Sequence, residues 1–191
     1  VKDGRHLAGA ELCAPMTALP AHIAWLRDRC DAVFLPFYLE KKSTEKGARR
    51  QLCYYTQFAP SLGGGASASD PDGRILRPIV HSLYGSVFSK AELYRALRPL
   101  TGGSVSPFDV SAAFDEAVRD KEEGLLRLRE VYRRESTRND GFHAVLLGRP
   151  YTVLSEWMNK GIPQTFASLG VPVFYQDMLS YTGEDVQGIA P

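Results

Sequence analysis

The order strand, helix, strand near the carboxyl end constrains the fold of this chain more than any other sequence feature. Residues 144–147 are all apolar and are followed by glycine and proline, a pattern typical of a parallel strand that is buried on both faces. Residues 162–169 have the pattern of the next helix, Gly170 of its left-handed end, and residues 171–175 of a second strand. This order predicts a parallel sheet with a right-handed crossover.

The amino-terminal half is expected to contain a helix followed by a strand. Apolar residues spaced by three and four predict a helix over residues 17–29, and the apolar run at residues 32–38 predicts a buried strand that Pro36 interrupts or ends. Residues 61–69 are rich in glycine and serine, have no periodicity and predict a flexible linker. This loop lacks the strand, the helix and the lysine of a phosphate-binding loop, so the linker is the favoured interpretation.

Two further helices have start signals. Ser89 and Glu92 have the spacing of a capping box, which predicts a short helix from Ser89 to about Leu97. Ser106 can cap a helix that has proline at its first position and an acid in its first turn, and the amphipathic pattern continues until Ser136. We therefore expect one long helix in the middle of the chain.

These elements predict an α/β architecture with two βα units joined by the long helix. The first unit is expected to span residues 1–139, including the long helix, and the second to span residues 140–191. Ligands of parallel sheets usually bind beyond the carboxyl ends of the strands, which places the expected functional edge at residues 148–151 and 176–178. Because the chain begins at Val1 without methionine, we expect it to be a piece of a longer protein.

Composition argues against several classes of protein. The chain has 191 residues, 44% of them hydrophobic and 24% charged, and a formal net charge of +1, so neither nucleic acid nor an anionic membrane is indicated as a partner. The basic cluster at residues 41–50 is interrupted by Glu45 and is best explained as a solvated helical face. Three cysteines are too few for a disulfide framework, and no apolar run approaches the roughly 20 residues that cross a bilayer. We therefore expect a cytoplasmic protein.

Cys13 and Cys53 are the candidate metal ligands. Cys13 is followed by Pro15, which keeps the backbone out of a regular helix while a helix begins just beyond, and a thiolate at a helix start is stabilised by the dipole. Cys53 precedes a cluster of aromatic residues. A 4Fe-4S cluster normally takes four thiolates, which this chain cannot supply, so buried thiols packed as small hydrophobes remain the alternative. Cys30 is expected in the core, on the apolar face of the first helix.

Hydrolase chemistry is not indicated. The four histidines lie at no diagnostic spacing from a nucleophile or a base, and the chain has neither a Gly-x-Ser-x-Gly nor a His-Glu-x-x-His motif. Asp177 and Glu156 are lone carboxylates and do not by themselves indicate acid–base catalysis.

Six short segments have distinctive sequences. They are residues 11–16, 34–36, 53–58, 148–151, 158–163 and 176–179. Together they resemble the 2-hydroxyacyl-CoA dehydratase and benzoyl-CoA reductase superfamily, and in particular its uncharacterised, activase-related branch (2-hydroxyglutaryl-CoA dehydratase-like). The resemblance spans nearly the whole chain, and the last three segments are the more specific ones.

The resemblance implies a flavodoxin-like α/β fold and a low-potential 4Fe-4S cluster held by cysteines from more than one segment. By this resemblance Cys13 and Cys53 are cluster ligands, and a further ligand lies beyond Pro191. Arg149 and Tyr151, at the expected functional edge, are candidate cofactor-binding residues. The resemblance also implies an ATP-dependent activase partner that supplies single electrons, and acyl-CoA as the substrate of a dehydratase or reductase. The alternative is a noncatalytic α/β scaffold or interaction domain of a large activase-fused protein.

Overall fold

A computed structural model describes residues 12–41, 50–62, 70, 73–81, 85–138 and 141–180 of the chain. The chain is divided into two compact units, unit 1 (Val1–Phe114) and unit 2 (Asp115–Pro191), and each unit is described by itself. The division falls within the long helix α6 (Pro107–Ser136). The boundary expected between residues 139 and 140 lies beyond the carboxyl end of this helix, and it stays a prediction.

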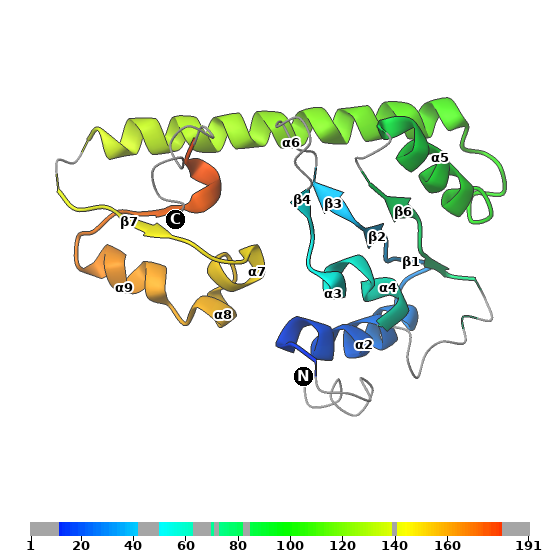
Figure 1. Cartoon of the computed structure of the whole chain (residues 1–191), viewed down its shortest axis with the longest axis horizontal. Coiled ribbons are helices and arrows are strands. Elements are labelled where there is room, and N and C mark those ends of the chain that lie inside the picture. The colour runs from blue at the N-terminus through cyan, green and yellow to red at the C-terminus, as the bar shows by residue number, and fades with distance from the viewer. Residues whose placement is uncertain are drawn as a thin grey trace, which may run out of the picture. The chain divides into compact units, whose positions relative to one another are not determined.

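Two parallel strand pairs form the centre of unit 1 (Figure 1). β1 (Val33–Phe34) pairs with β5 (Ile75–Leu76), and β2 (Phe37–Tyr38) pairs with β6 (Ile79–Val80), with the same register in both pairs. Four backbone hydrogen bonds of 2.8–3.1 Å join the segment of β1 and β2 to the segment of β5 and β6. Each runs from an amide of the first segment to a carbonyl of the second: from residue 33 to 74, 35 to 76, 37 to 78 and 39 to 80. The two pairs are therefore one parallel ladder with a gap.

Two prolines explain the gap in this ladder. In the common register Pro36 lies opposite Pro78, and the parallel pattern would require the amide of residue 78 to donate to the carbonyl of Leu35. Because proline has no N–H, this hydrogen bond cannot form and the regular ladder stops on both sides of the pair. The sequence predicts an interruption at Pro36, and the structure confirms it.

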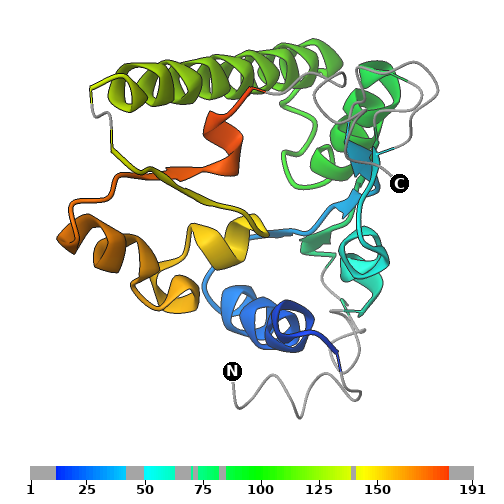
Figure 2. The same ribbon diagram turned by 60° about the vertical axis from the view of Figure 1, so that its left-hand side comes forward.

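Helices cover the ladder of unit 1 on both sides. α2 (Ala14–Arg27) contacts β1, and α5 (Ser86–Leu97) contacts β6. Figures 1 and 2 both show these two helices on opposite sides of the strands. Ile23 of α2 packs with Val33 and Ile75 in a buried core cluster, which burial of apolar surface stabilises. Partly buried residues around this cluster are Leu19, Leu26 and Leu35.

A short antiparallel pair and two short helices complete unit 1. These elements are β3 (Glu40–Lys41), β4 (Arg50–Gln51), α3 (Tyr54–Gln57) and α4 (Ala59–Leu62). β3 pairs with β4, α3 contacts β2 and α4, and α4 also contacts α2. Most of the predicted basic cluster (residues 42–49) and of the predicted linker (residues 63–69) lies outside the described residues.

Helix α5 begins earlier than the capping-box pattern predicts. Its first residue is Ser86, which follows Gly85 with φ 76°, and Ser89 lies inside the helix. Ser89 is fully buried; its Oγ accepts from the amide of His81 at 3.2 Å and donates to the carbonyl of His81 at 2.9 Å. The prediction that Ser89 caps the helix is therefore wrong, because this hydroxyl instead joins α5 to the residue that follows β6.

The start of α6 agrees with the sequence. Ser106 Oγ accepts a hydrogen bond from the amide of Asp109 at 3.2 Å, while Asp109 Oδ2 accepts from the Ser106 hydroxyl at 2.7 Å and amide at 2.9 Å. The hydroxyl first, and the amide second, hold the pKa of the Asp109 carboxyl below its ordinary value of 3.8. The predicted long helix is confirmed, and it ends at Ser136.

Unit 2 contains the predicted order of strand, helix and strand. β7 (Ala144–Leu146) pairs in parallel with β8 (Val173–Tyr175). Between these strands the chain forms α7 (Pro150–Val153), α8 (Glu156–Asn159) and α9 (Ile162–Ser168), and after β8 it forms the 3₁₀ helix η1 (Gln176–Met178). The predicted parallel pairing and the mixed α/β class of the chain are therefore confirmed.

The predicted left-handed glycine ends α9. Gly170 has φ 73°, and its amide donates to the carbonyl of Ala167 at 3.0 Å. The amide of Val171 donates to the carbonyl of Phe166, also at 3.0 Å. This pair of hydrogen bonds is a Schellman motif, which satisfies the last carbonyls of the helix and turns the chain into β8.

The strands of unit 2 lie between α9 and the carboxyl-terminal half of α6 (Figure 2). α9 contacts β8, and the ring of Tyr132 in α6 meets the ring of Phe174 edge to face, with centroids 4.9 Å apart. Phe174 is buried, but Val145 of β7 is 37% exposed and its two neighbours are half-buried. The expectation that this strand is buried on both faces is wrong within unit 2, because one of its faces is not covered.

No helix among the described residues combines the length and the apolar character needed to cross a membrane.

Candidate functional site

Cys13 and Cys53 have the same local structure. Each is the residue directly before a helix, α2 or α3, with similar backbone angles: φ −61° and ψ 151° for Cys13, and φ −52° and ψ 138° for Cys53. Neither side chain caps its helix. The carbonyl of each cysteine accepts a hydrogen bond at 3.0 Å from the amide four positions later, that of Thr17 or of Gln57. Each cysteine is thus fixed at the entry to its first helical turn.

A second hydrogen bond is repeated at both cysteines. Thr17 Oγ1 shares its hydrogen between the carbonyls of Leu12 at 3.1 Å and Cys13 at 3.3 Å, and Gln57 Nε2 donates to the carbonyl of Leu52 at 2.6 Å. In both cases the side chain four positions after the cysteine binds the carbonyl of the leucine before it. We call this arrangement the Leu-Cys clamp. The repeated Leu-Cys pair followed by a side-chain donor is a sequence signal that the motif analysis missed.

Both thiols are available for metal ligation. They form no disulfide bond, Cys53 is exposed and Cys13 is half-buried. Cys13 lies at the amino end of the 14-residue α2. Because α4 contacts both α2 and α3, the helices that follow the two cysteines share a neighbour in unit 1. The convergence of the two sulfur atoms on one site stays a prediction.

The donor set within the described part of the chain is incomplete for a cluster. In those residues no group of three or more histidine, cysteine, aspartate or glutamate side chains could hold a metal ion. The thiolates of Cys13 and Cys53 have the chemistry that iron prefers, but a 4Fe-4S cluster normally takes four cysteines. These two residues could therefore supply part of a ligand set.

Cys30 does not lie in the core. Helix α2 ends at Arg27, and the amides of Arg29 and Cys30 both donate to the carbonyl of Leu26 at 2.9 Å in the turn that follows. The Cys30 side chain is exposed. The sequence prediction is wrong because it extended the helical face beyond the end of the helix.

The two segments of the expected functional edge meet in unit 2. The amide of Gly148, which follows β7, donates to Oε1 of Gln176, which follows β8, at 3.1 Å. Residues 148–151 and 176–178 therefore lie together at the carboxyl ends of two parallel strands. A Cβ atom at Gly148 would lie 2.9 Å from Cγ1 of Val153, so this position has no room for a side chain.

Arg149, Tyr151 and the carboxylate Asp177 are among the side chains that this edge presents to solvent. Arg149 precedes α7, and its Nη1 donates to the Tyr151 hydroxyl at 3.3 Å. Both residues are exposed. A guanidinium group held beside a phenol can bind an anionic group of a cofactor. The role of these two residues in cofactor binding stays a prediction.

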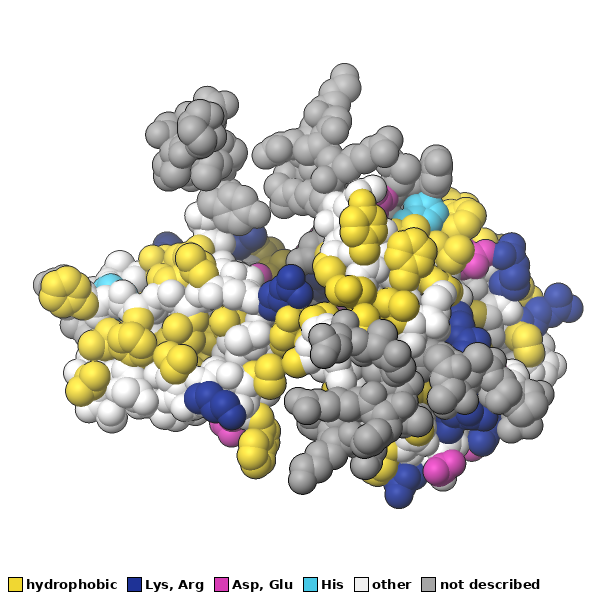
Figure 3. Space-filling model, turned by 60° about the horizontal axis from the view of Figure 1, so that its bottom comes forward, with side chains coloured by type: hydrophobic (Ala, Val, Ile, Leu, Met, Phe, Trp, Pro, Cys, Tyr) yellow, Lys and Arg dark blue, Asp and Glu magenta, His cyan; other side chains and the backbone are white. Residues whose placement is uncertain are grey.

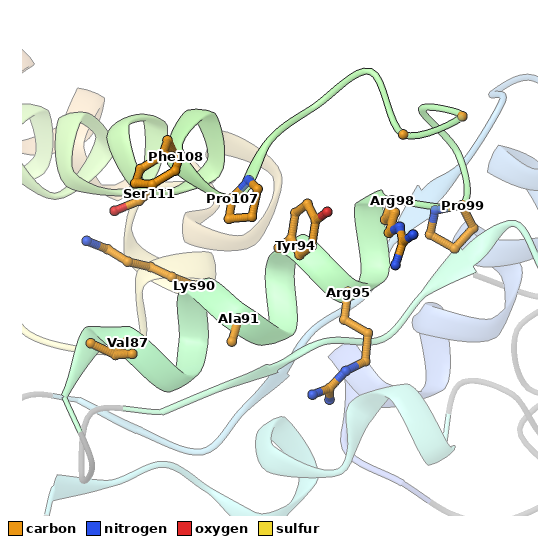
Figure 4. Close-up of a pocket in the computed structure, with 12 residues that line it drawn as sticks. Val87, Lys90, Ala91, Tyr94, Arg95, Arg98, Pro99, Pro107, Phe108 and Ser111 are labelled. Atoms are coloured by element: carbon orange, nitrogen blue, oxygen red, sulfur yellow. The ribbon is translucent and has the colours of Figure 1, made fainter.

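A basic groove lies between α5 and the start of α6 in unit 1 (Figure 4). Its volume is about 990 Å³. Lys90 and Tyr94 point from α5 toward the first turn of α6, with Tyr94 beside Pro107, whereas Arg95 extends to the opposite side of α5. Arg95 forms an ion pair with Glu92, and Lys90 Nζ lies 5.6 Å from the centroid of the Phe114 ring. Other groove residues include Arg98 and Phe108.

A smaller polar cavity of about 330 Å³ lies elsewhere in unit 1. Three of its lining residues are buried polar side chains, Glu40, Gln57 and His81. The rest of the lining consists of Leu39, Gln51, Ile79 and Phe88. This cavity could not be predicted from the sequence, because its residues come from five separate segments of the chain and have no common spacing.

A single family model covers unit 1 and most of unit 2. A family model described as CoA enzyme activase uncharacterised domain matches residues 1–179 of the chain. The chain belongs to this family. No curated protein and no solved structure matches the chain. The activase-related part of the sequence resemblance is thereby confirmed.

Within this CoA enzyme activase domain, the match includes every candidate residue proposed from the sequence. The structure brings the two segments of the edge in unit 2 together, and it gives Cys13 and Cys53 equivalent positions before two helices. The basic groove had a partial sequence signal, because Lys90 and Arg95 occur on one short helix and Arg98 directly follows it. The polar cavity had no sequence signal of this kind.

Proposed function

We propose that this chain is an iron–sulfur module of the CoA enzyme activase family. In this proposal Cys13 and Cys53 supply two thiolate ligands of a 4Fe-4S cluster, and the remaining ligands come from outside the described residues. The Leu-Cys clamp is the observation that carries the proposal. It holds two free cysteines in the same geometry at the entry of two helices, which a pair of unrelated buried thiols would not require.

The residues of the chain have separate tasks in this proposal. Thr17 and Gln57 orient the two Leu-Cys pairs through their hydrogen bonds. When bound, such a cluster transfers single electrons. The exposed position of Cys53 leaves room for a cluster shared with ligands from another segment.

The proposal extends to the partners of the chain and to the type of sheet that its strands form. An ATP-dependent activase supplies the electrons, and the module belongs to a dehydratase or reductase that acts on acyl-CoA in the cytoplasm. The groove with Lys90, Arg98 and Tyr94 supports an acyl-CoA partner, because its phosphates and adenine ring suit basic and aromatic side chains. Arg149 and Tyr151 are proposed to contact a cofactor, and the parallel pairs of the two units are proposed to form flavodoxin-like sheets.

The test is an iron and sulfide analysis of the natural full-length protein after anaerobic purification. Cys13→Ala and Cys53→Ala are each expected to lower the iron and sulfide content and to change the electron paramagnetic resonance signal of the reduced cluster. Cys30→Ala is the matched control, because Cys30 is exposed and lies outside the clamp. Full iron occupancy in both of the first two variants would contradict the ligand assignment.

A noncatalytic interaction domain is the second candidate function, and the surface of unit 2 favours it. Apolar side chains are exposed on and around α8 and α9, where Figure 3 shows yellow side chains gathered on the face turned to the viewer. They include Leu154, Trp157, Met158, Ile162 and Leu169, and Trp157 is 87% exposed. Exposed apolar surface of this kind marks interaction sites. A full-length protein that binds its activase without iron, and that loses this binding on Trp157→Ser, would support this candidate over the cluster.

A further inference from the structure

The polar cavity of unit 1 contains a buried carboxylate oxygen with no hydrogen-bond partner among the described residues. Glu40 is 9% exposed, and its Oε1 atom is buried with no hydrogen-bond partner in the described part of the chain. A buried carboxylate oxygen without a hydrogen bond is unfavourable, so such an atom points to a donor that binds there. The cavity that Glu40 lines, at about 330 Å³, has the size of a small ligand site.

The backbone holds Glu40 in this position. Glu40 lies in β3 opposite Gln51 of β4. The preceding residue, Leu39, donates its amide to the carbonyl of Val80 at 3.1 Å and accepts from the amide of Leu52, also at 3.1 Å. This strand is therefore fixed on both edges, and the side chain of Glu40 cannot leave the cavity by a simple movement of its backbone.

The polar neighbour of Glu40 in the cavity offers a second acceptor. Gln57 is buried, and its Nε2 is already committed to the carbonyl of Leu52 at 2.6 Å. The amide oxygen is then the atom that Gln57 can offer to a ligand. Glu40 and Gln57 together make a site that accepts hydrogen bonds, which suits a ligand that only donates them.

The remaining walls combine the polar residues His81 and Gln51 with aromatic and aliphatic side chains. The rings of His81 and Phe88 are tilted by 46°, with centroids 4.5 Å apart. Ser89 holds the backbone of His81 through both its amide and its carbonyl. Leu39 and Ile79 supply aliphatic surface. A ring face attracts a cation, and an aliphatic wall receives the alkyl part of a ligand.

We propose that this cavity binds a small organic cation, namely a protonated primary alkylamine. The ammonium group donates hydrogen bonds to Glu40 and Gln57, and the alkyl chain lies against Leu39, Ile79 and Phe88. A three-ligand metal site is not favoured, because the described residues contain no group of three or more histidine, cysteine, aspartate or glutamate side chains that could hold a metal ion. This inference shares Gln57 with the Leu-Cys clamp at Cys53, but it does not require a cluster to be bound there.

The binding experiment uses the whole chain with n-butylammonium chloride as the probe. Titration is followed by amide chemical shifts in NMR spectra, with sodium chloride at the same concentration and n-butanol as separate references. We expect saturable binding of n-butylammonium, with shifts at His81 and Gln57, and much weaker binding of n-butanol. Glu40→Gln is expected to weaken binding of the cation about tenfold or more, because it removes a charge-assisted hydrogen bond.

The matched control is Glu92→Gln, which removes a carboxylate from α5 outside the cavity. It is expected to leave the binding of n-butylammonium unchanged. Equal binding of n-butanol, unchanged binding by Glu40→Gln, an absence of saturable binding by the wild-type chain, or binding of zinc chloride in preference to the amine would each overturn the proposal.

Thermal stability without ligand is the second measurement. Glu40→Gln keeps the shape of the side chain and replaces a buried carboxyl group that has an unpartnered oxygen atom by a neutral amide, so we expect its melting temperature to rise above that of the wild-type chain. A lower melting temperature, or failure of this variant to fold, would show that the carboxylate already has a stabilising partner. Either result would overturn the proposal.

Discussion

The parallel strands of unit 1 and those of unit 2 differ in how they are covered. In unit 1, Val33, Ile75 and Leu76 are all buried, and helices contact the ladder from opposite sides. In unit 2, Phe174 is buried, but Val145 on the neighbouring strand is exposed. The same parallel pairing therefore occurs in a closed core and in a partly open one.

This difference separates two kinds of surface. Unit 1 has a core of its own, and its free cysteines, its basic groove and its polar cavity lie around that core. Unit 2 leaves large apolar side chains exposed on α8 and α9. The comparison indicates that unit 1 is suited to hold small ligands, whereas unit 2 is suited to contact another protein surface.

The largest expected effect tests the closed core of unit 1. Ile23→Ala should lower the free energy of unfolding by about 2–5 kcal/mol, because the side chain is 2% exposed and its loss leaves a cavity. The measurement is urea unfolding followed by the fluorescence of Trp25 in a Trp157→Phe background. Val87→Ala, at a position that is 77% exposed, is the control and should change this free energy by about 0.5 kcal/mol or less. Equal losses in the free energy of unfolding for the two variants would contradict a closed core in unit 1.

An intermediate effect tests the packing at the edge of unit 2. Gly148→Ala should lower the free energy of unfolding by about 1–3 kcal/mol, because its Cβ atom would overlap Cγ1 of Val153. The measurement is a double-mutant cycle with Val153→Ala, in which urea unfolding of all four proteins is compared. We expect a coupling of about 0.5 kcal/mol or more, since removal of Cγ1 relieves the overlap. Additive changes in the free energy of unfolding would show that the added methyl group does not overlap Val153, and that this edge of unit 2 is loosely packed.

The smallest effect tests the start of α6, which begins in unit 1. Ser106→Ala should lower the free energy of unfolding by about 1 kcal/mol, because the amide of Asp109 loses its cap. It should also raise the pKa of Asp109 toward 3.8, since the Ser106 hydroxyl is the main cause of the low value. The measurement is an NMR titration of the Asp109 carboxyl, and an unchanged pKa would contradict this assignment.

The pH dependence that follows from Asp109 has a defined sign. Its pKa is lower in the folded chain than the ordinary value of 3.8, so the stability that it contributes is fully present above pH 3.8. That contribution is lost as the pH falls through the folded-state pKa. In Ser106→Ala the acid-dependent loss should become smaller, which urea unfolding at several pH values below 4 can measure.

The elements that the sequence predicted best have local signals. Gly170 and the serine and proline at the start of α6 determine the backbone within a few residues, so the ends of these helices were found. Ser89 has the same kind of local signal but lies within a helix that begins at Ser86, and the pattern alone does not distinguish these two positions. Cys30 was misplaced for the related reason that the end of α2 was set too late.

The candidate site depended on contacts between distant segments. The meeting of Gly148 with Gln176 could be predicted, because parallel strands place their carboxyl ends at one edge. β5 and β6 were missed, because Pro78 divides them into two very short apolar runs. The burial of Glu40 could not be predicted, because it results from pairing with β4 and from side chains that lie far away in the sequence.

The paired prolines of unit 1 also affect how this domain behaves toward other copies of itself. The amides of β1 and β2 that do not point toward β5 and β6 belong to alternate residues, and Pro36 stands in the middle of that row. A strand of another copy that approached this edge would meet no N–H donor in the middle of the edge, because residue 36 is proline. Pro78, which lies opposite Pro36, also interrupts the ladder. A buried, apolar β segment is thereby a poor template for edge-to-edge aggregation during folding, when its covering helices are not yet in place.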